Sequence, residues 1–285
     1  VLFGSVHHPV LTTLYHFLQE RARRRVVFLA NELVPNEPGF FYQLSQDRQN
    51  GRFLLGDGDP VDWEDVVSTA LDGFFVQPES LENYAPVDQE YLQTESWASL
   101  IALFESLAQR GPVANHILKR DTVNSRTATL AHLLCHGLPV PPVCVTSSPE
   151  RLQTFVEQHP AGVLYRPLNG KDSPFQPWDS EAQARVDRVR LCPVHLEAIV
   201  EGAASQVVRV GEDWITQGEE VPEEHLDRLQ AAMDDLQLHL AEATFYQGAQ
   251  GWTCMDLKPF VGPGLFARKS HADLLATFFE EGKVS

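Results

Sequence analysis

Hydrophobic residues follow two different spacings at the start of the chain, and these spacings predict a strand, a helix and a second strand. Short apolar runs occupy residues 1–4 (VLFG) and 26–31 (VVFLAN). Between them, from Pro9 to Arg24, apolar residues recur at the three- and four-residue spacing of a buried helix face. Residues 40–78 continue with short apolar runs separated by turn residues, which indicates further strands. This order of elements is typical of an α/β fold.

The middle of the chain predicts three helices and two strands. One helix begins at Thr94 and ends at Gly111-Pro112, and the next runs over 121–136 and ends at Gly137. The apolar run 143–146 (VCVT) predicts a strand. Ser147 and Glu150 then have the spacing of a capping box at the start of a third helix. A short strand over 162–167 (GVLYRP) completes the segment.

The last third of the chain predicts a β-hairpin, a helix, two paired strands and a final helix. The hairpin covers 195–200 and 206–210, and the helix covers 223–240. The paired strands lie near 242–246 and 252–259, and alternation along the second strand places Asp256 and Lys258 on one face. Ser270 is the expected cap of the final helix. We therefore divide the chain into three parts, 1–112, 113–193 and 194–285.

Charge and composition exclude several classes of protein. The 22 basic and 39 acidic side chains give a net charge of −17, which repels nucleic-acid phosphates. No apolar run is long enough to span a membrane, and the stretch VLFGSVHHPV lacks the charged and small-residue flanks of a signal peptide, so we expect a cytoplasmic protein. The 4 cysteines lack paired spacing and are expected to be buried thiols.

The turn after the first strand also argues against a dinucleotide-binding site. Its sequence is GSVHH, without the glycine spacing of a Rossmann motif, so the sequence does not favour a dehydrogenase. His7 and His8 stand where the end of a parallel strand would open onto a cleft. Two histidines in a turn are either solvated or functional, and the sequence leaves both interpretations open.

The order of these elements resembles the ATP-grasp superfamily, in particular its glutathione-synthetase-like branch. That branch includes ribosomal-protein glutamylating enzymes and microviridin-type peptide ligases. The resemblance covers nearly the whole chain. It rests on five stretches: a helix with Glu95 near its start followed by Asn115, GLPVP with VCVTSSPERLQTF, VLYRPLNG, HLEAIVEG, and MDLKP. It implies an α/β fold with α+β lobes, namely an N-terminal pre-ATP-grasp domain, a small lobe and a C-terminal lobe.

The resemblance implies ATP and Mg²⁺ as cofactors, since activation of a carboxylate as an acylphosphate must gather a triphosphate, a divalent metal and an acid. Arg126 and Arg166 stand near the two family lysines that contact phosphates, and arginine keeps their charge but not their shape. Gly170 and Lys171 fall in the phosphate loop. The adenine-binding strand corresponds to Glu197, the backbone of Ala198 to Val200, and Glu201 towards the ribose.

The metal positions implied by the resemblance are Asp256 and Glu242, whose oxygens suit magnesium. Lys258 occupies the position of a family asparagine, and an ammonium has no lone pair for a metal. Three interpretations follow: Lys258 turns away, it acts as an in-built catalytic cation beside Asp256, or the metal site has been lost.

Two functions therefore remain open. The first is an ATP-dependent carboxylate–amine or peptide ligase, in which Arg166 and Lys258 take part in catalysis. The second is a non-catalytic ATP-grasp-like protein that binds a nucleotide, a peptide or a partner. The substrate is a small molecule or a peptide. The expected partners are a precursor peptide or a homologous ligase subunit, a homodimer is open, and neither nucleic acid nor membrane is expected.

Overall fold

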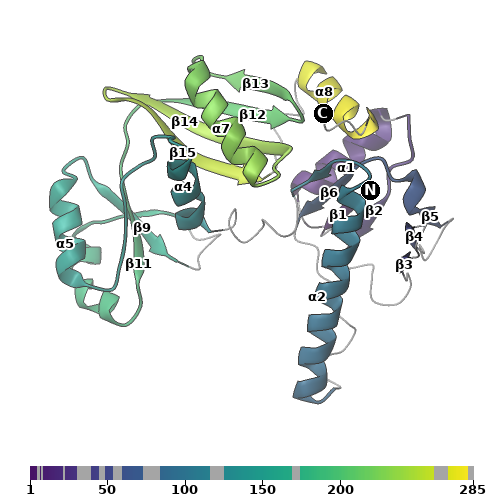
Figure 1. The fold of residues 1–285 in the computed structure, drawn as a ribbon. Helices are drawn as coiled ribbons and strands as arrows, with labels where there is room; N and C mark the ends of the chain where they lie inside the picture. Colours follow the sequence, from purple (N-terminus) through teal and green to yellow (C-terminus); the bar gives the residue numbers. More distant parts are fainter. Residues whose placement is uncertain are drawn as a thin grey trace.

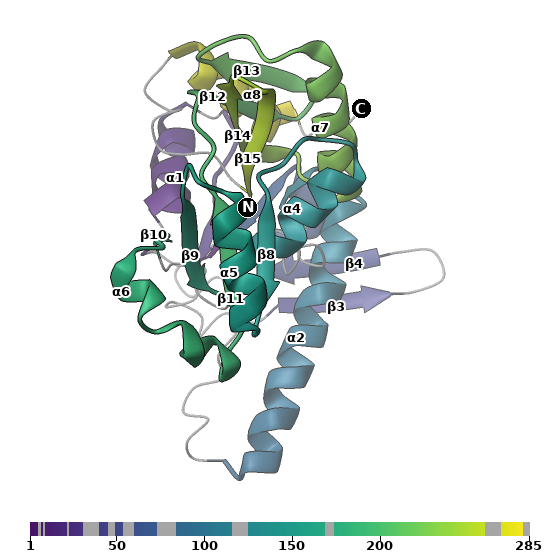
Figure 2. The ribbon, with the colours of Figure 1, turned by 90° about the vertical axis from the view of Figure 1, so that its left-hand side faces the viewer.

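The computed structural model describes residues 1–4, 7, 9–21, 23–30, 40–44, 49–53, 60–72, 84–115, 125–168, 174–259 and 269–281. Within these residues, helices and strands form three main groups (Figure 1). The N-terminal group contains a parallel sheet, the second group contains an antiparallel sheet packed against helix α5, and the third contains an antiparallel sheet with longer strands. A rotated view shows the same three groups (Figure 2).

A parallel sheet covered on both faces forms the first group. Its strand order is β2-β1-β6-β7, and its strands are β1 (Leu2–Gly4), β2 (Phe28–Ala30), β6 (Thr69–Asp72) and β7 (Val113–Ala114). Helix α1 (Pro9–Arg21) packs against one face, and helix α2 (Pro86–Ala108) packs against the other. Alternation along the strands explains this, since Leu2 lies in the core with α1 and Phe3 in the core with α2. The predicted strand–helix–strand opening is confirmed.

A small antiparallel sheet accompanies this group. It consists of β3 (Phe40–Leu44), β4 (Gln49–Phe53) and β5 (Val61–Asp62), followed by a 3-10 helix (Trp63–Asp65). Trp63 is completely buried in the core beneath α2. This sheet therefore belongs to the N-terminal group.

The second group is a four-stranded antiparallel sheet of order β10-β9-β11-β8. Its elements are β8 (Val143–Thr146), α5 (Pro149–Gln158), β9 (Val163–Pro167), β10 (Gln176–Pro177), α6 (Ser180–Gln183), a 3-10 helix (Val186–Arg190) and β11 (Val194–Ala198). Leu152 and Phe155 of α5 pack on Leu196 of β11. We call this group the small lobe.

The third group is an antiparallel sheet of order β13-β12-β14-β15 with a different core on each face. Its elements are β12 (Ala203–Val210), β13 (Asp213–Gln217), α7 (Glu223–Asp235), β14 (Leu240–Gly248) and β15 (Gly251–Pro259). One face packs against α7 and against α4 (Arg126–Cys135). At one end of the other face, Val208 and Val210 meet α1 and the final helix α8 (Lys269–Glu281). We call this group the C-terminal lobe, and it stands between the other two (Figure 1).

Several predicted helices have different bounds in the structure. Helix α1 ends at Arg21 rather than Arg24, and helix α4 begins at Arg126 rather than at 121, because its cap Ser125 has an extended backbone. Helix α2 begins at Pro86, eight residues before the predicted cap Thr94, whose hydroxyl instead donates to the carbonyl of Glu90 inside the helix. A proline in the first turn, rather than a threonine cap, therefore marks the start of this helix. Helix α7 ends at Asp235, because Gln237 adopts a positive φ of 53° and the chain turns into β14.

The predicted hairpin of 195–200 with 206–210 is wrong. β11 pairs with β8 and β9, whereas β12 pairs with β13 and β14. At each of the two predicted boundaries, after residues 112 and 193, the next strand belongs to the preceding sheet. β7 joins the N-terminal sheet, and β11 joins the small lobe. Two further predictions concern positions rather than pairing. The cap of α5 is Ser148 rather than Ser147, and α8 begins at Lys269, before the expected cap Ser270.

Two expectations about composition can be compared with the structure. Among the described residues, no helix is long and apolar enough to cross a membrane. The cysteine expectation is correct for Cys254, which is buried, and burial raises the pKa of its thiol to about 12. It is wrong for Cys135 and Cys192, which are exposed.

Candidate functional site

Helix α4 carries Arg126 at its first position, and this side chain joins carboxylates from two lobes. Ser125 caps the helix by accepting from the backbone N–H of Ala128. Nε and Nη2 of Arg126 donate to the two Glu197 oxygens at 2.9 and 2.6 Å. Nη1 donates to Oδ1 of Asp256 at 2.8 Å. Glu197 lies on β11 and Asp256 on β15, so Arg126 bridges the small lobe and the C-terminal lobe.

The Arg126–Glu197 pair is buried and charged. Only 11% of the Arg126 side chain and 3% of the Glu197 side chain are exposed. Burial alone would lower the pKa of Arg126, but the hydrogen bonds and charge of Glu197 and the charge of Asp256 raise it above its usual value. Burial alone would raise the pKa of Glu197, but hydrogen bonds from His195 and Arg126 lower it. The forked geometry therefore keeps both groups ionised.

Two further side chains hold the Glu197 carboxylate in place. Nε2 of His195 lies 3.4 Å from Oε2 of Glu197, and Nδ1 of His195 lies 2.9 Å from the hydroxyl of Thr127. A carboxylate only accepts, so Nε2 donates to it, and a neutral imidazole then accepts from Thr127 at Nδ1. Thr127 follows Arg126 on α4, so this chain of contacts fixes the start of the helix against β11.

Arg166 of β9 stands beside this network. Its guanidinium carbon lies 4.7 Å from the centre of the Phe175 ring, and that of Arg126 lies 5.5 Å from the same ring. Burial and then the positive charge of Arg126 lower the pKa of Arg166, whereas Glu197 and Asp256 oppose that effect. Arg166 shares the Phe175 ring with Arg126, and Arg126 is bound to Asp256, so the three residues belong to one site. We call Arg126, Arg166, Phe175, His195, Glu197 and Asp256 the interlobe site.

Asp256 has further partners besides Arg126. The backbone N–H of Leu257 donates to its Oδ1 at 3.0 Å, and Nζ of Lys258 lies 3.6 Å from its Oδ2. Asp256 and Lys258 thus share a face of β15, as alternation predicted. The Asp256 carboxylate is neutralised by one guanidinium and one ammonium. Lys258 is 60% exposed, so its contribution is screened by water.

Glu242 lies on the neighbouring strand β14, directly opposite Lys258 in the register. Since Thr244 pairs with Asp256, Glu242 and Asp256 are diagonal neighbours on one face of the sheet. Glu242 is 9% exposed. The two residues predicted as metal ligands therefore occupy the same face, and Lys258 stands on that face with them.

The predicted nucleotide-binding residues are distributed over the end of β11 and the turn after it. Ala198 is buried, and its backbone N–H already donates to the carbonyl of Pro142 at 3.0 Å. Val200 is half-buried and Glu201 is exposed. Gly170 and Lys171 lie outside the described residues.

The sequence reasoning did not select Thr127, Phe175 or His195. A signal for His195 was present, because alternation along HLEA places it on the same face as Glu197. Thr127 follows from its position next to Arg126 once the helix start is known. Phe175 gave no signal, since it follows a polar stretch of sequence and reaches the site only through the tertiary fold.

Comparisons with known proteins identify the fold. No protein-family model matches this chain, and no curated protein sequence matches it. Among solved structures, a Chryseobacterium gregarium RiPP-associated ATP-grasp ligase in complex with ADP and a leader and core peptide is similar. It has a TM-score of 0.77 and 10% identity, with 100% of this chain and 98% of that chain covered.

Two further solved structures agree along nearly their whole length. The macrocyclase MdnC from Microcystis aeruginosa, bound with precursor peptide MdnA, has a TM-score of 0.75 at 15% identity, covering 98% of each chain. The ATP-grasp ligase PsnB with precursor peptide PsnA2 and AMPPNP has a TM-score of 0.74 at 17% identity, covering 99% of this chain and 96% of that one. The chain therefore has the ATP-grasp fold, and the predicted fold class is confirmed.

Proposed function

We propose that this protein is an ATP-dependent ligase that joins a carboxylate to an amine on a peptide. The observation that carries the proposal is the interlobe site. Arg126 of α4 and Arg166 of the small lobe stand there with Asp256 of the C-terminal lobe, within a fold shared over its whole length with ATP-grasp ligases. The similar structures named above contain leader, core or precursor peptides, which supports a peptide as the substrate.

The reaction that we propose has two balanced steps. A carboxylate oxygen of the substrate attacks the γ-phosphorus of ATP, and the bond from that phosphorus to the leaving oxygen of ADP breaks. The product is an acylphosphate. An amine nitrogen then attacks the acyl carbon, the bond to phosphate breaks, and the nitrogen releases a proton. The sum is one amide, ADP and inorganic phosphate.

Arg166 is the residue of the interlobe site best suited to meet phosphate oxygens. All three guanidinium nitrogens of Arg126 already donate to carboxylates. Arg166, in contrast, is half-buried and packs on the face of Phe175. Aromatic stacking holds a guanidinium in one plane and leaves its edge for oxygen acceptors. We propose that Arg166 stabilises the charge that develops on the transferred phosphoryl group, with Lys258 as an exposed second cation.

Other nucleotide contacts are proposals from the resemblance. Gly170 and Lys171 would cover the phosphates, and backbone groups of Ala198 and Val200 would meet adenine, with Glu201 near the ribose. For Glu197 we propose a role other than the expected contact with adenine. Because it is buried and bound to Arg126 and His195, we assign it the role of positioning Arg126.

The magnesium site has the correct atoms in an unsuitable charge environment. Asp256 and Glu242 offer carboxylate oxygens, which magnesium prefers. In the arrangement described, however, Oδ1 of Asp256 accepts from Arg126 and Leu257, and Lys258 faces Oδ2. A metal at Oδ1 thus requires Arg126 to leave that oxygen, and a metal at Oδ2 requires Lys258 to move away. PsnB has been solved with Mg and ADP, so we propose that Mg²⁺ accompanies ATP, and we assign no step to it.

The second candidate function is binding without chemistry. The ion pairs of Asp256 with Arg126 and Lys258 favour it, because they satisfy the carboxylate without a metal. Such a protein would hold a peptide, a nucleotide or a homologous ligase subunit at the same site.

One assay separates the two candidates. The purified chain is mixed with ATP, magnesium and a short peptide encoded beside its gene, and ADP and the peptide mass are followed. The ligase predicts stoichiometric ADP and the loss of one water per new amide. Binding without chemistry predicts a complex with neither change. Lys258→Asn restores the family residue: increased turnover indicates a weakened metal site, whereas lost turnover shows that Lys258 itself acts.

The cellular location and the assembly of the protein are also proposals. We propose a cytoplasmic protein, where ATP and a newly made peptide are both available, and a homodimer is one assembly to test. The net charge of −17 argues against a nucleic-acid partner.

A further inference from the structure

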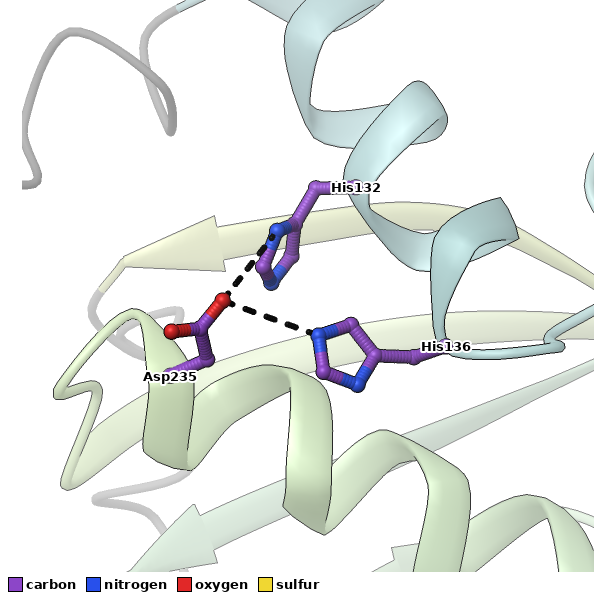
Figure 3. A group of neighbouring side chains, drawn as sticks. All are labelled: His132, His136 and Asp235. Carbon is purple, nitrogen blue, oxygen red and sulfur yellow. Dashed lines mark ion pairs between the residues drawn. The ribbon is translucent and has the colours of Figure 1, made fainter.

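We propose that His132, His136 and Asp235 form a binding site for a transition-metal dication, with Zn²⁺ as the best match. Figure 3 shows both imidazole rings turned towards the same carboxylate oxygen of Asp235. We call these three residues the histidine cluster. It lies at the other end of α4 from Arg126 and shares no residue with the interlobe site.

The sequence builds the cluster from two packed helices. His132 lies on α4 and His136, four residues later, caps its C-terminal end, so the two side chains lie on the same side of the helix. Asp235 is the last residue of α7. Leu133 of α4 and Met233 of α7 are both fully buried in the core between these helices. That core fixes the separation between the histidines and the carboxylate.

The distances suit ligands around an ion better than direct hydrogen bonds. Oδ2 of Asp235 lies 3.8 Å from Nδ1 of His132 and 3.7 Å from Nε2 of His136, and the ligand atoms of all three residues lie within 4.8 Å of one another. Most N–H···O hydrogen bonds span about 2.7–3.2 Å, so both contacts are longer than usual for a hydrogen bond. In a tetrahedral zinc site with bonds of about 2.0–2.1 Å, two ligand atoms are roughly 3.3 Å apart. Each of the two distances to Asp235 would have to shorten by about half an ångström to match this spacing.

His132 already has the hydrogen bond that orients a metal-binding imidazole. Its Nε2 lies 3.0 Å from the carbonyl oxygen of Ala232. A carbonyl only accepts, so Nε2 carries the proton, and the lone pair of Nδ1 points towards Asp235. Metal-binding histidines characteristically donate their second nitrogen to a carbonyl or a carboxylate in this way.

The local field also favours a cation. His136 is the C-terminal cap of α4, and Asp235 ends α7, which has no basic residue in its last turn. Helix C-termini carry partial negative charge, so two of them meet a carboxylate at this point. Asp235 is 59% exposed, and His136 is 26% exposed, which gives an ion and a water ligand a path from solvent.

The ligand types select the metal. Two imidazoles and one carboxylate match zinc, which binds nitrogen and oxygen in fourfold coordination, with water as the fourth ligand. Magnesium and calcium prefer sets of oxygens. The cluster therefore belongs to a different class of site from the carboxylates of the interlobe site.

The test is a calorimetric titration of the tag-free, EDTA-treated chain with ZnCl₂ in the absence of nucleotide. We expect one zinc per chain. His132→Ala and His136→Ala should each weaken binding at least about 10–100-fold, the range seen even for residues that only support ligands. Asp235→Asn should weaken it as well, and MgCl₂ should give no comparable binding.

Two matched controls identify the ligands. His16→Ala removes an exposed histidine on α1, and Cys135→Ser removes the exposed thiol next to His136. Both should bind zinc like the unaltered chain. The proposal is overturned if both histidine variants bind zinc with unchanged affinity, or if either control loses as much zinc affinity as they do. The absence of zinc binding by the folded, unaltered chain overturns it as well.

The outcome is independent of the proposed ligase activity. Arg166→Ala should retain zinc affinity, because the cluster shares no residue with the nucleotide site. Conversely, His132→Ala tests zinc binding whether or not the chain turns over ATP. Circular dichroism of each variant in EDTA confirms folding, so that a lost zinc signal reports on the site.

Discussion

The two ends of helix α4 carry two differently built groups of charged side chains. At the N-terminal end, Arg126 donates to Glu197 and Asp256 over 2.6–2.9 Å, and 11% of its side chain is exposed. At the C-terminal end, His132 and His136 stand 3.7–3.8 Å from Asp235, which is largely exposed. The first group is internally satisfied, whereas the second surrounds a space that suits a cation.

This difference shows what each end contributes. A buried charge network that satisfies itself holds lobes in place, because removing one member leaves another charge buried without a partner. An open set of ligands adds stability only when an ion binds. Substitutions at the N-terminal end should therefore lower the stability of the protein, and substitutions at the C-terminal end should change how much zinc stabilises it.

The largest expected effect comes from Arg126→Ala. It leaves the Glu197 carboxylate buried with its main partner removed, and we expect the free energy of unfolding to fall by about 3–5 kcal/mol. Urea unfolding measures this. The matched control is Arg21→Ala, which removes an exposed pair with Asp273 and should cost about 0–1 kcal/mol. Equal losses in the two variants would show that the Arg126 network is not a buried charge network.

The next effect concerns zinc. At a free concentration 100 times the dissociation constant, zinc should raise the free energy of unfolding by about 2.7 kcal/mol. His132→Ala should remove this increase. Thermal or urea unfolding with and without ZnCl₂ checks both statements, and stabilisation that persists in the variant would place the ion elsewhere.

A smaller effect appears in acid. Burial alone would raise the pKa of Glu197, but the hydrogen bonds and positive charges of His195 and Arg126 together outweigh that effect. Its pKa in the folded state therefore lies below the unfolded value of about 4.3. Its contribution is thus complete above that value and disappears as the pH falls through the folded pKa. The free-energy difference between the unaltered chain and Glu197→Gln should shrink below about pH 4. A difference that stays constant down to acid unfolding would contradict the lowered pKa.

The smallest effect is expected at Lys258. Its ammonium is 60% exposed and 3.6 Å from Asp256, so Lys258→Met should change the free energy of unfolding by less than about 1 kcal/mol. Urea unfolding measures this change. A loss similar to that of Arg126→Ala would place Lys258 inside the buried network.

The parts of the fold that local patterns determine were predictable. Apolar spacing located α1, α5 and α7, and alternation placed Asp256 and Lys258 on one face. Strand pairing was less accessible: β11 and β12 are adjacent in sequence but lie in different sheets, because pairing depends on contacts far along the chain. The start of α2 was misplaced because a threonine is equally suited to a cap and to a helix interior, where Thr94 bonds Glu90.

The site was predictable as a set of residue types but not as a set of contacts. The resemblance selected Arg126, Glu197 and Asp256 for three separate tasks, whereas the structure joins them through one guanidinium. Nothing in the sequence signals that joining, since the three residues come from three distant elements. The histidine cluster was missed for the same reason: two histidines at helical spacing become a site only when α7 brings Asp235 to them.

The central claim is that the interlobe site binds ATP through Arg166. Calorimetric titration with ATP and magnesium tests it on the unaltered chain, on Arg166→Ala and on Arg190→Ala, which removes an exposed arginine of the same lobe. We predict that ATP binds the unaltered chain and Arg190→Ala equally, and at least about 10-fold more weakly to Arg166→Ala, since a charge-assisted pair contributes about 1.5–3 kcal/mol. Equal affinity in all three proteins, or no binding to any of them, would contradict the claim.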